Sequence, residues 1–293
     1  MAQTGFLTRT ISRVRDQLDE PDANAKWTDA KIIEYIETAY AMVFGDLNRG
    51  QPNPLLLEYN VTSTTETADE DYVIPPNVGS VIRMTIRNSD GDVISFINYR
   101  GIHNPFGQGI KIMGGILRIK EGVLPVGRIL NIEYIPSGTA RLHEATTATT
   151  AAGTITLAAS PTVGTLGNRL QEYTGSIVRI LGSSSAHDYV ADRLITGYVN
   201  TTRVATCIAD WQETPSGTVT YEIAPMLDAV LDMPISFYVS KTIASIEGDA
   251  NRKTTLEQSY RDIMRSVRLQ HATYHSYVTS LFRGDTIQNS RYY

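Results

Sequence analysis

The chain has 293 residues, a formal net charge of −5 and a composition that is 42% hydrophobic and 19% charged. This is ordinary globular composition, which excludes a largely disordered chain, and the length exceeds that of a usual single domain. Its one cysteine, Cys207, excludes an intrachain disulfide. No apolar run approaches the length of a membrane span, and the first 18 residues lack the compact apolar region of a secretory signal. The sequence therefore predicts a protein that is soluble and intracellular when made.

Charge is unevenly distributed along the chain. Residues 251–293 hold seven Lys/Arg against three Asp/Glu, a net charge of +4, which leaves −9 on residues 1–250. The acidic bulk argues against a dedicated nucleic-acid binder. The basic end is either an ordinary solvated helix face or an arm that binds an acidic partner.

Two amphipathic helices are predicted first. Leu7, Ile11, Val14 and Leu18 form one apolar stripe, which Pro21 ends. A second helix is predicted to begin at Thr28, whose hydroxyl can accept a hydrogen bond from a first-turn amide, and to stop at Gly50. Its stripe consists of Ile33, Ile36, Tyr40, Val43 and Leu47.

From about Leu55 the apolar period changes to two, which is typical of strands. Val78, Ile82, Met84 and Ile86 are expected to face inward. Hairpin turns are predicted at Asp90-Gly91 and Gly114-Gly115, and a last strand at Ile129–Tyr134. The antiparallel region therefore covers roughly residues 55–136.

A stretch of small and β-branched residues then marks a boundary near Gly138. Up to about Glu222, short strands separated by polar turn residues predict a small all-β sandwich or barrel. The expected strands are Thr154–Leu157, Ser176–Leu181, Asp192–Tyr198, Arg203–Ile208 and Val219–Ile223.

Helical spacing returns at Pro225, is broken or restarted at Pro234, and ends at Gly248. The run Thr254–Glu257 has the pattern of a capping box and predicts the start of a long last helix that ends at Gly284. The N-terminal stripes and Ile235, Val239, Ile263 and Val267 are expected to share one core.

The predicted fold class is α+β. Terminal helices form one bundle, from which an antiparallel β region and an inserted all-β lobe project. The predicted domains are 1–138 (helical pair and antiparallel region), 139–222 (inserted module), 223–284 (C-terminal helices on the N-terminal helices) and 285–293 (extended tail).

The chain offers weak candidates for chemistry. His271 and His275 lie four apart, yet Ala272 replaces the glutamate of a zinc peptidase, so surface histidines are favoured. The polar run Ser183–Asp188 lacks a nucleophile elbow, and Asp69–Asp71 lacks calcium-loop spacing, so both are interpreted as polar turns. Cys207 is interpreted as a buried inert thiol, and Gly107–Gly109 is too short for a dinucleotide fingerprint. The sequence predicts no enzyme, and no catalytic, cofactor or metal site.

Four segments in order resemble phage head-to-tail adaptor (connector) proteins: TRTISRVRDQLDE at 8–20, KWTDAKIIEYIETAYAMV at 26–43, YVIPPNVGSVIRMTI at 72–86 and LPVGRILNIEYIPSG at 124–138. A further segment, 172–223, is similar to a small β module of phage virion proteins. The features that match that module are Tyr173-x-Gly175, a turn centred on Gly182, Thr201–Ala205, Trp211 and Pro215. The sequence differs from the module at Ser183–Ala186.

The resemblance implies a structural virion protein at the neck, assembled in the host bacterial cytoplasm. Adaptors of this kind form rings, usually of twelve copies, that bind the portal, surround the DNA channel and dock the next tail or nozzle protein. The C-terminal tail is expected to be an extended arm that binds the portal or a neighbour, because Arg and Tyr give large contact energies. The residues expected to make this contact are Arg283, Asp285, Arg291, Tyr292 and Tyr293. A frayed terminus is the alternative.

Two other functions stay open at this point. Another neck or tail-tube structural protein would share the β module. A glycan-binding or glycan-degrading tail component would rest on Tyr173, Tyr198 and Trp211.

Overall fold

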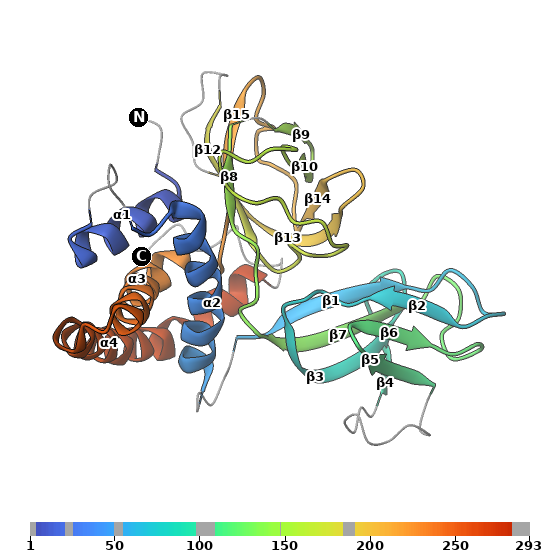
Figure 1. Cartoon of the computed structure of the whole chain (residues 1–293). Coiled ribbons are helices and arrows are strands. Elements are labelled where there is room, and N and C mark those ends of the chain that lie inside the picture. Colours follow the sequence, from blue (N-terminus) through green and yellow to red (C-terminus); the bar gives the residue numbers. More distant parts are fainter. Residues whose placement is uncertain are drawn as a thin grey trace. The chain divides into compact units, whose positions relative to one another are not determined.

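A computed structural model describes residues 4–20, 26–49, 55–97, 109–146, 148–183 and 191–282, with side chains described up to residue 269. The predicted α+β class is confirmed: helices from both ends of the chain pack together, and the strands form antiparallel sheets. The chain divides into two compact units (Figure 1). One joins Met1–Pro54 to Gly138–Tyr293, and the other is Leu55–Ser137.

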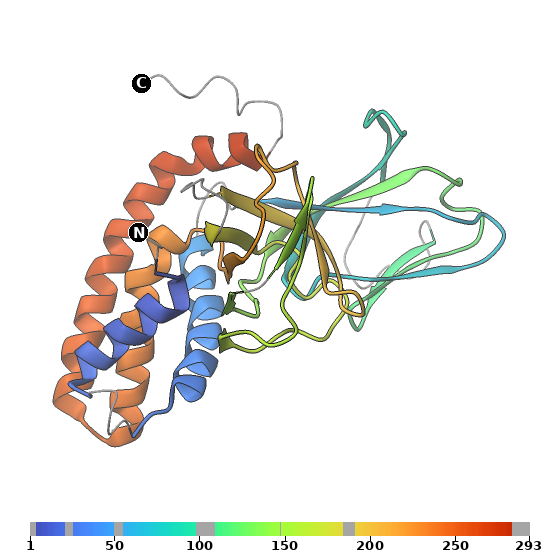
Figure 2. The ribbon, with the colours of Figure 1, turned by 90° about the horizontal axis from the view of Figure 1, so that it is seen from above.

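The helical bundle belongs to the first unit. Its helices are α1 (Phe6–Leu18), α2 (Asp29–Asn48), α3 (Asp228–Glu247) and α4 (Ala250–Phe282). Helix α3 packs against each of the other three, and the helices lie side by side (Figure 2). The predicted core residues are buried with one exception: Ile263 is half-buried, and Met264 takes its place in the core.

Several of the predicted helix boundaries can be compared with the described residues. Thr28 caps α2 by accepting from the Lys31 amide at 3.3 Å, and Gly248 ends α3 in the left-handed conformation, as predicted. The prediction that a capping box at Thr254–Glu257 starts the last helix was wrong, because α4 already begins at Ala250. The Asp249 carboxylate accepts the Arg252 amide there at 2.9 Å. Helix α3 begins at Asp228 and continues through Pro234 without a break.

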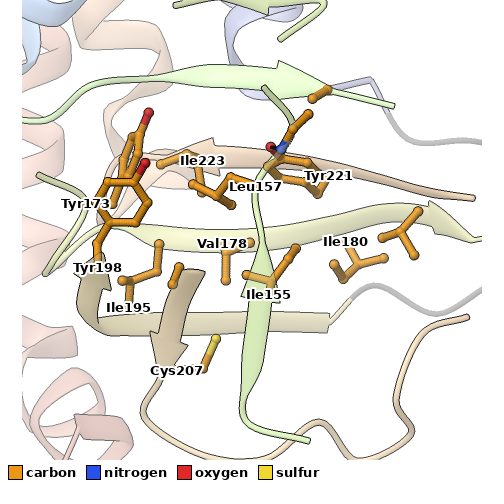
Figure 3. Close-up of a cluster of buried hydrophobic side chains, with 14 of the residues drawn as sticks. Ile155, Leu157, Tyr173, Val178, Ile180, Ile195, Tyr198, Cys207, Tyr221 and Ile223 are labelled. Atoms are coloured by element: carbon orange, nitrogen blue, oxygen red, sulfur yellow. Dashed lines mark hydrogen bonds between the residues drawn. The ribbon is translucent and has the colours of Figure 1, made fainter. Parts of the chain in front are cut away.

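The β module of the first unit is one eight-stranded antiparallel sheet in the order β11-β8-β15-β12-β13-β14-β10-β9, and it is not closed into a barrel. Its apolar side chains gather in one cluster, with Tyr173 and Tyr198 side by side at one end (Figure 3). The predicted turn at Gly182 was wrong, because this glycine lies inside β12, at a bulge opposite β15. The strands are β8 (His143–Ala145), β9 (Thr149–Ala151), β10 (Thr154–Thr156), β11 (Val163–Gly164), β12 (Ile177–Ser183), β13 (Ala191–Val199), β14 (Val204–Cys207) and β15 (Val219–Ala224).

The second unit contains two antiparallel sheets, ordered β1-β7-β3-β4 and β2-β6-β5. The predicted hairpins at Gly91 and Gly114 are confirmed, since they join β3 to β4 and β5 to β6. The prediction that Ile82 faces inward was wrong, since its side chain is 53% exposed. Bulges in β3 shift the alternation of inward-facing and outward-facing residues. The strands are β1 (Leu57–Thr62), β2 (Glu70–Val73), β3 (Val78–Arg87), β4 (Val93–Ile97), β5 (Ile110–Met113), β6 (Ile116–Ile119) and β7 (Ile129–Pro136).

The two units differ from the predicted domains. The helical pair and the antiparallel region, grouped by the sequence as 1–138, fall in different units. The module 139–222 belongs to the same unit as the helices. The predicted tail 285–293 lies outside the described residues.

Gly138 stands where the chain returns to the first unit. Its φ is +77°, and a Cβ there would lie 2.8 Å from Phe44 Cβ and 3.0 Å from Ala41 Cα. We expect Gly138→Ala to lower the free energy of unfolding by about 2 kcal/mol, because strain and overpacking add. Gly122→Ala is the matched control, with φ +72° and no atom within 4 Å of a Cβ, and should cost about 1 kcal/mol. Equal losses in urea unfolding of both variants would contradict the close contact with α2.

Candidate functional site

A set of charged side chains joins the first turn of α1 to the β module. Gly5, the residue before the helix, offers no side-chain cap. Two carboxylates from the module take that role: Glu222 of β15 accepts from the Phe6 amide, and Glu144 of β8 accepts from the Thr8 amide at 2.8 Å and the Thr8 hydroxyl at 2.6 Å. Carboxylates at this position also complement the positive end of the helix dipole. The sheet thereby fixes where α1 begins.

Arg179 of β12 is the cation at the centre of this network. Its guanidinium contacts Asp192 at 2.8 Å, Glu222 at 2.7 Å and Asp228 at 2.7 Å. These carboxylates raise the pKa of Arg179, with Asp228 as the largest cause. Burial raises the pKa of Glu222 to about 6, while the Phe6 amide and Arg179 act in the opposite direction. Because Asp228 is the first residue of α3, Arg179 ties the sheet to that helix.

On its helical side the network continues from α1 to α3. Arg13 lies 2.5 Å from Asp232, and Arg9 lies 3.6 Å from Asp232 and 3.8 Å from Asp228. The Thr10 hydroxyl is 3.0 Å from the same Asp232 carboxylate. We call the residues of this paragraph and the two before it the polar junction; it connects α1, α3 and the sheet within one unit.

A second polar group lies inside the module. The His143 ring contacts the Tyr173 hydroxyl through Nδ1 and the Tyr221 hydroxyl through Nε2, each at 3.1 Å. Tyr221 accepts the Ala158 amide at 2.8 Å, and Tyr173 accepts the Gly167 amide. Burial lowers the pKa of His143 to about 3, so the ring is neutral at pH 7. An imidazole held in this way anchors two loops and is closed to solvent.

The second unit exposes an apolar edge strand. Among the strands that the structure describes, β4 pairs only with β3, and Val93, Ile94 and Phe96 are 46%, 51% and 66% exposed. An edge strand presents unpaired backbone groups, and natural proteins usually protect such an edge. An exposed apolar edge strand of this kind is a candidate interaction surface.

The acidic run Asp69–Asp71 is the solvated turn that the sequence predicted only in part, because Asp69 and Asp71 are exposed but Glu70 begins β2 and is buried. Glu70 is 9% exposed, and its carboxylate accepts from the Thr64 amide at 2.8 Å and the Ser63 hydroxyl at 2.7 Å. Burial opposes ionisation, but these hydrogen bonds lower the pKa of Glu70 to about 2. Asp71 pairs instead with Arg118 at 2.6 Å. The run therefore organises a loop and does not form a shared cation site.

The other predicted residues have varied outcomes. The arm residues Arg283, Asp285, Arg291, Tyr292 and Tyr293, the side chains of His271 and His275, and most of Ser183–Asp188 lie outside the described residues. Cys207 is buried, and burial raises the pKa of its thiol to about 12. Among the described residues, no three His, Cys, Asp or Glu side chains are placed to hold a metal ion.

Sequence reasoning missed the polar junction, His143 and the exposed β4. Glu222 and Arg179 sit in strands whose alternation suggested only a small β module, and their partners lie up to 216 residues away. One signal was available: an acidic residue at an otherwise apolar strand position, as in Tyr221-Glu222-Ile223. Such a residue indicates that the fold stabilises a buried carboxylate, but it does not identify the partner that does so.

The described helices include none that is long and apolar enough to cross a membrane. No family model matches the chain, and no curated protein is similar enough to count as a relative. Inference about function therefore rests on the residues and their geometry.

Proposed function

We propose that this chain is a structural virion protein, a head-to-tail adaptor whose copies form a ring on the portal of a tailed phage. The ring would surround the DNA channel and give the next tail or nozzle protein its docking surface. The observation that carries the proposal is the packing of helices from both ends of the chain around α3, with the sheets built from the residues between them. This is the bundle that the apolar stripes predicted, and its first two helices overlap segments that resemble adaptor proteins.

A ring subunit needs two complementary faces and a firm frame, and it needs no catalytic pocket. The polar junction supplies rigidity, because it fixes α1 and α3 to the module. The net charge of −9 on residues 1–250 suits a protein that lets DNA pass without holding it. The exposed β4 supplies an apolar edge that contact with a second copy would cover.

We expect Phe96→Asp to weaken self-association at least tenfold while leaving the subunit folded, because the side chain is 66% exposed before assembly and desolvated after it. Analytical ultracentrifugation over a concentration series measures the effect, and circular dichroism checks the fold. Ile246→Asp, at a 56% exposed position on α3, is the matched control and should assemble normally. Unchanged assembly of the Phe96 variant would remove β4 from the subunit contact.

The adaptor function itself is tested on heads of the phage that encodes the chain. Purified protein should bind DNA-filled, tailless heads and not empty precursors, and electron microscopy should show a ring at the portal vertex. Binding only to isolated tails would favour the second candidate, a neck or tail-tube protein. Binding to neither would refute both.

The glycan-binding alternative loses its support in the structure. Tyr173, Tyr198 and Trp211 are 0%, 1% and 5% exposed, so these rings fill the module core and cannot stack on a sugar. Figure 3 shows the first two inside the apolar cluster.

A further inference from the structure

The outer face of α4 carries a row of arginines. Arg261, Arg265 and Arg268 follow one another at spacings of four and three, which places them on one side of a helix. They border an open hollow of about 630 Å³ whose wall also includes Tyr260, Met264 and Leu269 of α4, Glu257 of α4 and Asp46 from the last turn of α2. We call Arg261, Arg265 and Arg268 the arginine face.

The two acidic groups of the hollow already have cationic or hydrogen-bonding partners. Asp46 accepts from the Tyr260 hydroxyl at 2.9 Å and lies 3.5 Å from Arg49. Glu257 accepts from Lys241 at 2.7 Å and from Arg261 at 2.9 Å. Neither carboxylate is left to neutralise the remaining arginines.

Arg265 and Arg268 therefore keep unused donors. Among the residues that the structure describes, Arg265 has no hydrogen bond or ion pair, and Arg268 donates to the Asp46 carbonyl at 2.9 Å. A guanidinium has five N–H donors in a fixed fork that matches a carboxylate. The positive charge of the C-terminal region, apparent in the sequence, is thus partly concentrated at one surface.

We propose that the arginine face binds an acidic segment of a partner protein, with carboxylates at helical spacing and an apolar side chain that enters the hollow. The charge complementarity is given by Arg265 and Arg268. The apolar part is given by Leu269, which is 70% exposed, beside the buried Met264. Arginine clusters recognise acidic motifs in this manner.

A protein partner fits this surface better than nucleic acid. A phosphate backbone requires a continuous basic track, whereas the guanidinium donors that remain available among the described residues of this hollow are confined to Arg265 and Arg268 of α4. An exposed leucine also gains nothing from a phosphate. The proposal goes beyond the ring function, because it states the chemistry of a partner and holds whichever virion position the chain occupies.

The test uses the full-length chain and a fluorescein-labelled synthetic helical peptide with Glu at positions i, i+4 and i+7 and Leu between them. Fluorescence anisotropy at about 50 mM salt measures binding, and raising the salt should weaken it. Arg265→Glu should lower the affinity at least tenfold, because an attractive charge becomes repulsive. Within the described part of the chain Arg265 has no partner to lose, so we expect the fold to be preserved. Lys253→Glu is the matched control: it makes the same charge change at an exposed position of α4 outside the hollow and should alter affinity less than twofold.

Four further probes separate the alternatives. The same peptide with Gln for Glu should bind at least tenfold more weakly, and one with Ser for Leu should also bind more weakly. Random-sequence duplex DNA and inorganic phosphate should not compete at matched charge concentration. The proposal is overturned if the Arg265 variant binds like the parent, if the Gln peptide binds as well as the Glu peptide, or if DNA binds more tightly than the peptide. Failure here leaves head binding unaffected, so it is distinguishable from failure of the adaptor function.

Discussion

Arg179→Met is expected to lower the free energy of unfolding by about 3–5 kcal/mol, the range for removing one partner of a buried ion pair. The substitution leaves Glu222 and Asp228, which are 0% and 6% exposed as residues, without their common cation. Desolvated carboxylates then repel one another across the polar junction. Urea unfolding followed by circular dichroism measures the loss, which is a large share of the stability of a typical domain.

Two further variants decide why Arg179→Met destabilises. Adding Glu222→Gln and Asp228→Asn to it removes the unpaired charges, so this triple variant should recover part of the loss. Arg261→Met breaks a pair with Glu257 whose arginine is 69% exposed, and it should cost no more than about 0.5 kcal/mol. If Arg179→Met proves as mild as Arg261→Met, the junction does not hold the helices to the sheet.

The helices and most strands were predictable because their signals are local. The apolar stripes of α1 and α2 and the Gly91 and Gly114 turns depend on residues a few positions apart. The errors also have local causes. Thr254 matches a capping box, yet Asp249 captures the Arg252 amide one turn earlier, and bulges in β3 expose Ile82.

The candidate sites were far less predictable, since they depend on contacts between distant segments. Glu222 reaches the Phe6 amide across 216 positions, and nothing near either residue in the sequence indicates that pairing. The exposure of Phe96 follows from the place of β4 at the edge of its sheet. Strand order is set by tertiary pairing, so a strand pattern alone does not reveal an edge.

The pH dependence of stability should reveal two buried groups that act in opposite directions. The pKa of His143 falls from 6.5 to about 3 on folding, so the unfolded chain binds the proton first as pH drops. The contribution of His143 to the free energy of unfolding is complete above pH 6.5. Below that pH it decreases by about 1.4 kcal/mol per pH unit. The pKa of Glu222 rises from 4.5 to about 6, so the folded chain takes up that proton first, and stability is gained between pH 6 and pH 4.5.

Between pH 6.5 and pH 4.5 the Glu222 gain of about 2 kcal/mol offsets part of the His143 loss of about 3 kcal/mol. Glu222→Gln removes the gain, so this variant should lose about 2 kcal/mol more than the parent over that interval. His143→Gln, whose amide can also donate and accept, removes the loss and should gain relative to the parent. Urea unfolding at each pH gives the slopes, each compared with the same variant at pH 7. Parallel slopes for all three proteins would mean that neither group has a pKa in the folded chain that differs from its unfolded value, and the neutral, loop-anchoring imidazole would have to be abandoned.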